Sequence, residues 1–350
     1  MEAIRRTVLP PAVAHLLGSA RFASALTLCI LGTAFGTHLL RATMGWAGLL
    51  AILITLVALA TLSLLSRRES IDWYGLPPIT ILVFLGWSIL SVFWSTTTFT
   101  SGGRVLYLLL FTALAVYLTL VRDTIQLVRG LGDVLRVLLG LSLTLEVVSG
   151  LLLDLPIAFL DIQGNIASFG PLQGVFGSRN QLGLVALIGL ITFSIEFMTR
   201  SVPRMQAVFS IALATLLVLF SGSPVTFGAF FVVGVAALAL AGIRRVPAAS
   251  RMYWQLGLLA AVTILGAVLW LLRSSILNVL NAGSEFEVRT ALWREILRYT
   301  QLNSLQGWGW VGAWQPTSPP YLWLNLATGV RRARRSAPSS TCTSSSAWSG

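Results

Sequence analysis

The chain has 350 residues, of which 56% are hydrophobic and 10% are charged. Soluble domains carry roughly 25% charged residues, so this composition excludes an ordinary soluble fold and indicates a polytopic membrane protein. The net charge of +12 comes from arginines that are spread between apolar segments. This spread argues against a basic patch for nucleic acid, and we expect no nucleic-acid partner.

Apolar segments of about 20 residues can cross a bilayer as helices. They predict an all-α transmembrane bundle of about nine spans, at 22–40, 46–66, 73–94, 105–121, 134–153, 181–198, 205–220, 225–243 and 255–272. The seventh of these segments is the shortest. We expect 1–21 to be a cytoplasmic N-terminus, 22–272 the transmembrane helical domain, 273–329 a long outer-face loop with a short amphipathic helix, and 330–350 a low-complexity tail.

The arginines divide between the two sides of this predicted bundle. With a cytoplasmic N-terminus, the cytoplasmic side receives Arg5, Arg6, Arg67, Arg68, Arg122, Arg129, Arg136, Arg200, Arg204, Arg244, Arg245 and Arg251. Between the spans, the other side receives only Arg41, Arg104 and Arg179. This pattern follows the positive-inside rule. It places 154–180, the turn at 221–224 and everything after Arg273 on the outer face.

Two glutamates lie within predicted spans. Glu146 is near the middle of the fifth, where an ionisable group costs at least a few kcal/mol unless it is paired or meets water. It is therefore a candidate functional residue, and a hydrogen bond to Ser142 or to a neighbouring helix is the structural alternative. Glu196, near the cytoplasmic end of the sixth span, is expected to pair with Arg200, four residues later.

The loop before the sixth span reads GPLQGVFGSRNQLG over residues 170–183. Its glycines and proline disfavour a regular helix, and Arg179 and Asn180 then open a span whose N-terminus points outward. A guanidinium beside a helix N-terminus favours a bound phosphate, because free N–H groups and the helix dipole both attract negative charge. The alternative is an interfacial arginine that anchors the helix end.

The long polar segment after the ninth span begins with the capping-box pattern of Ser284 followed by Glu287. This pattern predicts a helix over about 285–302. Arg289 and Trp293 lie four residues apart and share a face of that helix.

A Gly-Trp-Gly-Trp run at 307–310 follows, and Gly307 and Gly309 give it a flexible backbone. A cation beside this aromatic turn could hold a sugar or an anionic group. The alternative is an amphipathic helix lying on the membrane with its tryptophans at the interface.

Metal and nucleotide chemistry have little support in the sequence. Cys29 and Cys342 are the only cysteines, and His15 and His38 the only histidines. They cannot form a disulfide framework or a metal cluster with conventional spacing. No glycine-rich phosphate loop of the nucleotide-binding types occurs. We expect no metal and no cofactor.

Three motifs together resemble the O-antigen ligase and polymerase family, which includes exopolysaccharide polymerases. They are the Gly-Val-Phe-Gly-Ser-Arg-Asn-Gln-Leu-Gly loop, the Leu-Phe-Ser-Gly-Ser turn, and Arg-Thr-Ala-Leu-Trp followed by Gly-Trp-Gly. The resemblance covers roughly residues 160–325. It implies an enzyme of a bacterial inner membrane that needs no metal. Such an enzyme transfers an oligosaccharide from a polyprenyl diphosphate to a hydroxyl of an acceptor glycan or lipid, outside the membrane.

The resemblance also implies site residues. Arg179 and Arg289 would bind the diphosphate, whose growing charge guanidinium groups stabilise well. Asn180, Trp293, Gly307 and Gly309 would support them. Two positions depart from the family pattern: Pro224 stands where the turn usually has an arginine, and no histidine follows His38 to act as the base of the outer loop.

The tail from about Val330 is crowded with arginine, serine, alanine and proline. It is typical of a disordered tail or of a frameshift in a GC-rich gene, and we favour the frameshift. The codons for Ser-Ser-Ala-Trp-Ser-Gly, read two nucleotides later, can spell an apolar Leu-Gly-Leu-Val-Gly. We therefore expect little or no transferase activity from the 350-residue chain, with its catalytic residues unknown.

Two other function classes stay open. A transporter or a flippase for lipid-linked sugars should show related halves and helices broken in mid-membrane, whereas Pro156, Pro203, Pro224 and Pro247 lie at predicted span ends. A non-catalytic partner in polysaccharide assembly would need no histidine.

Overall fold

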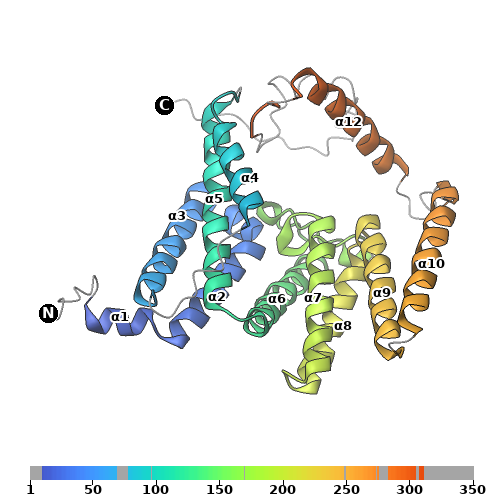
Figure 1. The fold of residues 1–350 in the computed structure, drawn as a ribbon, viewed down its shortest axis with the longest axis horizontal. Coiled ribbons are helices and arrows are strands. Elements are labelled where there is room, and N and C mark those ends of the chain that lie inside the picture. The colour runs from blue at the N-terminus through green and yellow to red at the C-terminus, as the bar shows by residue number, and fades with distance from the viewer. Residues whose placement is uncertain are drawn as a thin grey trace. The chain divides into compact units, whose positions relative to one another are not determined.

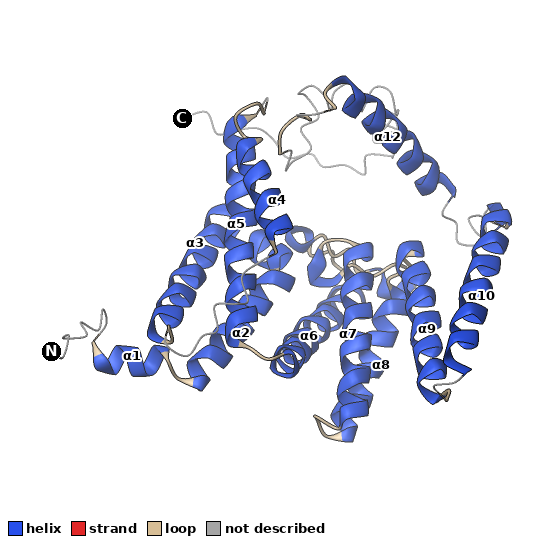
Figure 2. Cartoon of the chain, in the orientation of Figure 1, coloured by secondary structure: helices blue, strands red, loops and turns tan. Residues whose placement is uncertain are grey.

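The computed structural model describes residues 10–68, 78–95, 97–168, 170–247, 250–272, 274–275, 283–304 and 307–310. These residues form helices and loops without a β-strand (Figure 2). The 330–350 tail lies outside the described residues, and so do the side chains of Ser284 and Glu287.

The helices follow one another along the chain as Figure 1 labels them. The α-helices are α1 (Pro11–Leu17), α2 (Ala20–Phe35), α3 (Thr37–Ser66), α4 (Ile79–Leu90), α5 (Thr98–Val121), α6 (Thr124–Val147), α7 (Arg179–Thr199), α8 (Arg204–Phe220), α9 (Pro224–Arg245), α10 (Arg251–Leu271) and α12 (Gly283–Leu302). Between α6 and α7 lie a π-helical turn, η2 (Val148–Leu153), and the 3-10 turns η3 (Ala158–Leu160), η4 (Asn165–Ser168) and η5 (Gly174–Phe176).

Each predicted apolar segment coincides with a helix, but the lengths differ. In the described part of the chain, six helices are long and apolar enough to cross a membrane: α3, α5, α6 with η2, α7, α9 and α10. The other three apolar helices, α2, α4 and α8, are shorter. Six spans are therefore supported by length, not nine. Helix α8 has 17 residues and α2 has 16, so the expectation that the seventh segment is the shortest is wrong over the described residues.

The chain divides into two compact units. Unit 1 combines the residues up to Leu82 with Leu106–Arg251, and unit 2 combines Val83–Val105 with the residues from Met252 onward. In unit 1, α7 and α8 pack closely as a hairpin, and α6 packs against α2, α7 and α8. The core between them is apolar, with Leu135, Leu139, Leu182, Phe193 and Leu217 fully buried.

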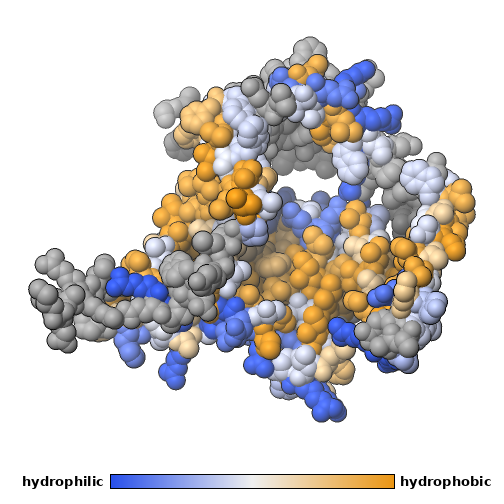
Figure 3. Space-filling model, in the orientation of Figure 1, coloured by the Kyte–Doolittle hydropathy of each residue, from blue (hydrophilic) through white to orange (hydrophobic). Residues whose placement is uncertain are grey.

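Large apolar side chains also cover the outside of the helices. In Figure 3 they gather over α7, α8 and α9, where Leu184, Leu219, Phe231 and Val232 are exposed. Helix α10 buries none of its apolar residues in the interior. Apolar surface of this extent is unfavourable in water and suits lipid, so the chain has the character of a membrane protein.

Unit 1 has two different ends. The loop end is where α6 ends and where α7 and α9 begin. It also contains the segment 154–178 between α6 and α7. At the opposite arginine end, α2, α6 and α8 begin and α3, α7 and α9 finish. The arginine end holds Arg67, Arg122, Arg129, Arg200, Arg204, Arg244 and Arg245. The loop end holds Arg41 and Arg179. These arginines of unit 1 are thus divided between its two ends as the sequence predicts.

Candidate functional site at the loop end of unit 1

The loop before α7 is held by two buried side chains of α6. Glu146 Oε1 accepts backbone N–H bonds from Gln173 at 2.8 Å and from Gly174 at 2.9 Å. Ser142 Oγ accepts the N–H of Val175 at 3.2 Å and donates to the carbonyl of Leu138. The Glu146 carboxylate is only 1% exposed. Its role is therefore to anchor this loop, and it does not bond to Ser142 as one alternative expected.

Two glycines let the loop approach the helices. Gly174 has φ +56° and Gly177 has φ +74°, a left-handed region that glycine adopts at little cost. A Cβ at Gly174 would lie 2.6 Å from the Cβ of Ser142, and a Cβ at Gly177 would overlap the ring of His38. The glycines that disfavoured a helix in the sequence thus permit close packing against α6 and α3.

His38, in the first turn of α3, joins the site. Its Nδ1 lies 3.2 Å from the carbonyl oxygen of Val175, which can only accept, so Nδ1 donates this hydrogen bond. Nε2 is 3.7 Å from Oδ2 of Asp161. The family pattern places a histidine only after the last span, so His38 was not among the predicted site residues. A contact across 137 positions leaves no local signal in the sequence.

The first motif continues directly into α7. Ser178 caps the helix by accepting the N–H of Gln181 at 3.3 Å, and Arg179 and Asn180 form the first turn. The guanidinium of Arg179 is therefore carried at the positive end of a helix of 21 residues.

The second motif, the turn between α8 and α9, meets the first. Ser223 donates its hydroxyl hydrogen to Oδ1 of Asn180 at 2.6 Å and caps α9 by accepting the N–H of Thr226. The N–H of Leu172 donates to the carbonyl of Phe220 at 2.9 Å. Two segments about 40 positions apart in the chain thus form one structure.

A cavity of about 340 Å³ lies where the two motifs meet. It is lined by Pro171, Arg179, Leu219, Phe220 and Gly222. One wall is cationic and the others are apolar, so the cavity suits an anionic group that carries a hydrocarbon or sugar portion.

Pro224, the residue that departs from the family pattern, has a structural place. It is the first residue of α9, directly after the capping Ser223. Proline fits this position because the first helical N–H needs no partner within the helix. The turn is thus complete without an arginine, and Arg179 is the arginine that lines the cavity.

The predicted polar helix is present in unit 2. It runs over Gly283–Leu302, so it begins two residues before the expected start and ends at the expected residue. Arg289 and Trp293 both lie on it, and Trp293 is 64% exposed. The described residues place this pair in unit 2, whereas Arg179 and Asn180 belong to unit 1.

The Gly-Trp-Gly-Trp run packs against other residues of unit 2. Trp308 donates its indole N–H to the carbonyl of Tyr299 at 3.1 Å and packs edge-on against that ring. Gly309 has φ +85°, and an added Cβ would lie 2.7 Å from the Cβ of Ser95. Trp310 packs edge-on against Phe84. These indoles are engaged with protein, which favours a packing role for them over sugar stacking.

Glu196 has a different partner from the one expected. Its carboxylate pairs with Arg136 of α6 and not with Arg200. Arg136 also donates to Asp133 and to Ser210 of α8, and its guanidinium lies over the Phe193 ring. Arg200 ends α7 in a left-handed conformation, which turns the chain away after the helix. The prediction of an ion pair within α7 is therefore wrong.

Among the residues that the structure describes, no three His, Cys, Asp or Glu side chains gather as metal ligands would. Comparison of the chain with protein-family models, with curated proteins and with solved structures gave no match.

Proposed function

We propose that this chain is an integral-membrane glycosyltransferase of the O-antigen ligase and polymerase type. It would act on a polyprenyl-diphosphate-linked oligosaccharide at the loop end of unit 1. The observation that carries the proposal is the cavity beside Arg179, where the loop 170–180 and the turn 221–223 meet through Asn180 and Ser223. These are two of the three motifs on which the family resemblance rests.

The proposed reaction depends above all on a site that stabilises negative charge. An oxygen of the acceptor hydroxyl attacks the anomeric carbon of the donor sugar, and the bond from that carbon to the diphosphate oxygen breaks. The diphosphate leaves with the electron pair, and the hydroxyl proton passes to a base or to water. A guanidinium at a helix N-terminus stabilises the charge that grows on the leaving group.

His38 supplies a base at the same end. His38 lies on α3, and its Nδ1 contacts the loop that leads to Arg179; in the neutral ring, Nε2 would carry the lone pair. A base of this kind typically contributes 10²- to 10⁴-fold to a proton transfer. We therefore include His38 in the proposal, in the place of the histidine that the sequence lacks after α10.

The proposal includes an orientation. We place the loop end on the outer face of a bacterial inner membrane and the arginine end and N-terminus in the cytoplasm, as the positive-inside rule indicates. The helix breaks described in unit 1, at Gly36, Gly45 and η2, lie toward the loop end. A transporter of the inverted-repeat type breaks its helices near mid-membrane, so this arrangement favours transfer over transport.

Donor binding by the purified 350-residue protein tests the anion site. Arg179→Ala should weaken the binding of a polyprenyl-diphosphate-linked oligosaccharide at least tenfold, because it removes a charge-assisted bond of about 1.5–3 kcal/mol. Arg179→Lys should restore only part of the lost donor affinity, since lysine lacks the two-pronged geometry of a guanidinium group. Arg41→Ala is the matched control, because Arg41 lies at the same end and stacks on Trp46. Equal affinity in Arg179→Ala and the wild type would refute the proposed site.

Turnover in the same preparation tests the base. If the unaltered protein transfers sugar and His38→Asn loses at least 10²-fold in rate with donor affinity unchanged, His38 serves as the base. Donor binding without turnover in the unaltered protein would refute the assignment of His38 as the base.

A further inference from the structure

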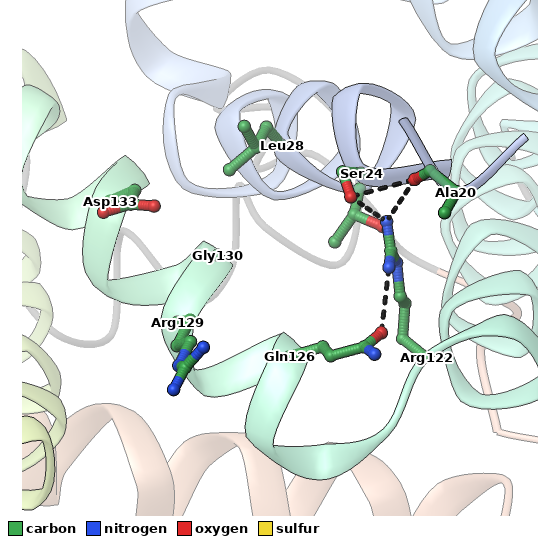
Figure 4. Close-up of a pocket in the computed structure, with 9 residues that line it drawn as sticks. Ala20, Ser24, Leu28, Arg122, Gln126, Arg129, Gly130 and Asp133 are labelled. Atoms are coloured by element: carbon green, nitrogen blue, oxygen red, sulfur yellow. Dashed lines mark hydrogen bonds between the residues drawn. The ribbon is translucent and has the colours of Figure 1, made fainter. Parts of the chain in front are cut away.

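A second cavity lies at the arginine end of unit 1, away from the site described above. It has a volume of about 400 Å³ and lies between α2 and the beginning of α6. Arg122, Gln126, Arg129 and Asp133 line it from the α6 side, and Ser24 and Leu28 from α2 (Figure 4).

Arg122 is fixed in this cavity by neutral acceptors. It donates to Ser24 Oγ at 2.6 Å, Gln126 Oε1 at 2.8 Å, Thr27 Oγ1 at 3.1 Å and the carbonyl of Ala20 at 3.4 Å. In Figure 4 its guanidinium lies between α2 and Gln126. Neutral partners orient the group and do not cancel its charge. The cavity therefore contains a positioned positive charge.

The other charges at the cavity leave it positive. Arg129 lines it one helical turn after Gln126 and is exposed. The only carboxylate in the lining, that of Asp133, is already paired with Arg136 at 2.8 Å. Asp123, the residue before α6, is exposed, makes no capping bond with its side chain and does not line the cavity. Two guanidinium groups thus line a space to which one carboxylate, already paired, also contributes.

We infer that this cavity binds the phosphate of an anionic phospholipid. Basic pockets between transmembrane helices on the cytoplasmic side are suited to anionic headgroups, because they meet them at the depth where phosphates lie. Leu28, 39% exposed, continues the wall of the cavity toward the apolar surface of α2, where an acyl chain would lie. A free phosphate would use the guanidinium groups alone and gain nothing from this apolar wall.

Lipid binding to the full-length protein in a neutral detergent tests the inference. We would add phosphatidylglycerol, phosphatidylcholine or inorganic phosphate, and measure the thermal shift together with the lipids retained in native mass spectrometry. Phosphatidylglycerol should stabilise the protein and be retained, because a ligand that binds only the folded state raises its stability. Phosphatidylcholine, which is zwitterionic, and phosphate at equal concentration should have little effect.

Arg129→Gln is the informative variant, because Arg129 is exposed and its loss leaves the bonds of Arg122 intact. It should weaken phosphatidylglycerol binding about tenfold, the effect of losing one charge-assisted bond. Arg245→Gln removes an exposed arginine from the same end outside the cavity and should leave binding unchanged. Unchanged binding in Arg129→Gln, or an equal loss in both variants, would overturn the site. Equal stabilisation by inorganic phosphate would overturn the assignment to a lipid.

Discussion

The two arginine-bearing segments that the sequence singled out are constructed in opposite ways. The loop before α7 is positioned by residues far away in the chain: Glu146 lies 28 positions from Gly174, and Ser223 lies 43 positions from Asn180. In the α12 segment, the hydrogen bond of Trp308 and the ion pair of Arg298 join near neighbours, Tyr299 and Glu295, and Trp310 makes a distant contact by ring packing against Phe84. The first segment contributes Pro171 and Arg179 to a cavity that residues of α8 also line.

The difference follows from how each backbone satisfies its polar groups. A non-helical loop packed into an apolar bundle has N–H groups that water does not reach, so side chains of the bundle must accept them. Glu146 and Ser142 do this. Helix α12 satisfies most of its N–H groups internally, and Arg289, Trp293 and Leu297 are exposed on it. A rigid anion site is therefore expected beside the loop, whereas α12 carries Arg289 as an exposed side chain.

Labelling from the two sides of the membrane tests most directly whether the two segments lie on the same face, because each cysteine either reacts from a given side or does not. In a protein with Cys29 and Cys342 replaced by alanine, Asp161→Cys and Ser284→Cys should both react with an impermeant reagent added to intact cells. Arg204→Cys should react only after the membrane is opened. Asp161 is 67% exposed at its side chain and represents the loop end. Labelling of Asp161→Cys and Ser284→Cys from opposite sides would mean that the two arginine segments cannot serve one site.

Loss of the Glu146 side chain should have the next largest effect. Glu146→Ala leaves the N–H groups of Gln173 and Gly174 without their acceptor, and each buried unsatisfied donor costs about 1–3 kcal/mol. We expect the free energy of unfolding to fall by about 2–4 kcal/mol, measured by titration with a denaturing detergent.

Glu295→Ala is the matched control for Glu146→Ala in the other segment. It removes a carboxylate that pairs with Arg298 at 3.7 Å, where the arginine is 77% exposed. Exposed pairs are worth at most about 1 kcal/mol, so the change should be small. Comparable losses in the two variants would contradict the view that only the first segment depends on buried partners.

The sequence predicted those features that local pattern determines. Apolar runs located the helices, and the motifs singled out 170–183 and 221–224, which the fold joins through Asn180 and Ser223. The four-residue spacing predicted an ion pair between Glu196 and Arg200, because that spacing suits a helix. The fold instead brings Arg136 from α6 to the Glu196 carboxylate. His38 was not predicted as a site residue, because only the break at Gly36 and the path of α3 bring its ring to Val175. Contacts between helices decide these cases, and a single sequence does not show which helix faces meet.

A further prediction concerns Gly177, and it tests whether the close approach of the loop to α3 is required. Gly177→Ala places a Cβ where φ is +74°, which costs about 1–2 kcal/mol, and where the His38 ring already lies. The free energy of unfolding should fall by at least that amount. Gly234→Ala, in a helix with open space around the added Cβ, should change it by less than about 1 kcal/mol. In a His38→Ala background the overlap disappears and only the backbone cost remains, so Gly177→Ala should be less harmful there. An equal cost with and without the His38 ring would show that the ring does not press on the loop, and would remove His38 from the site.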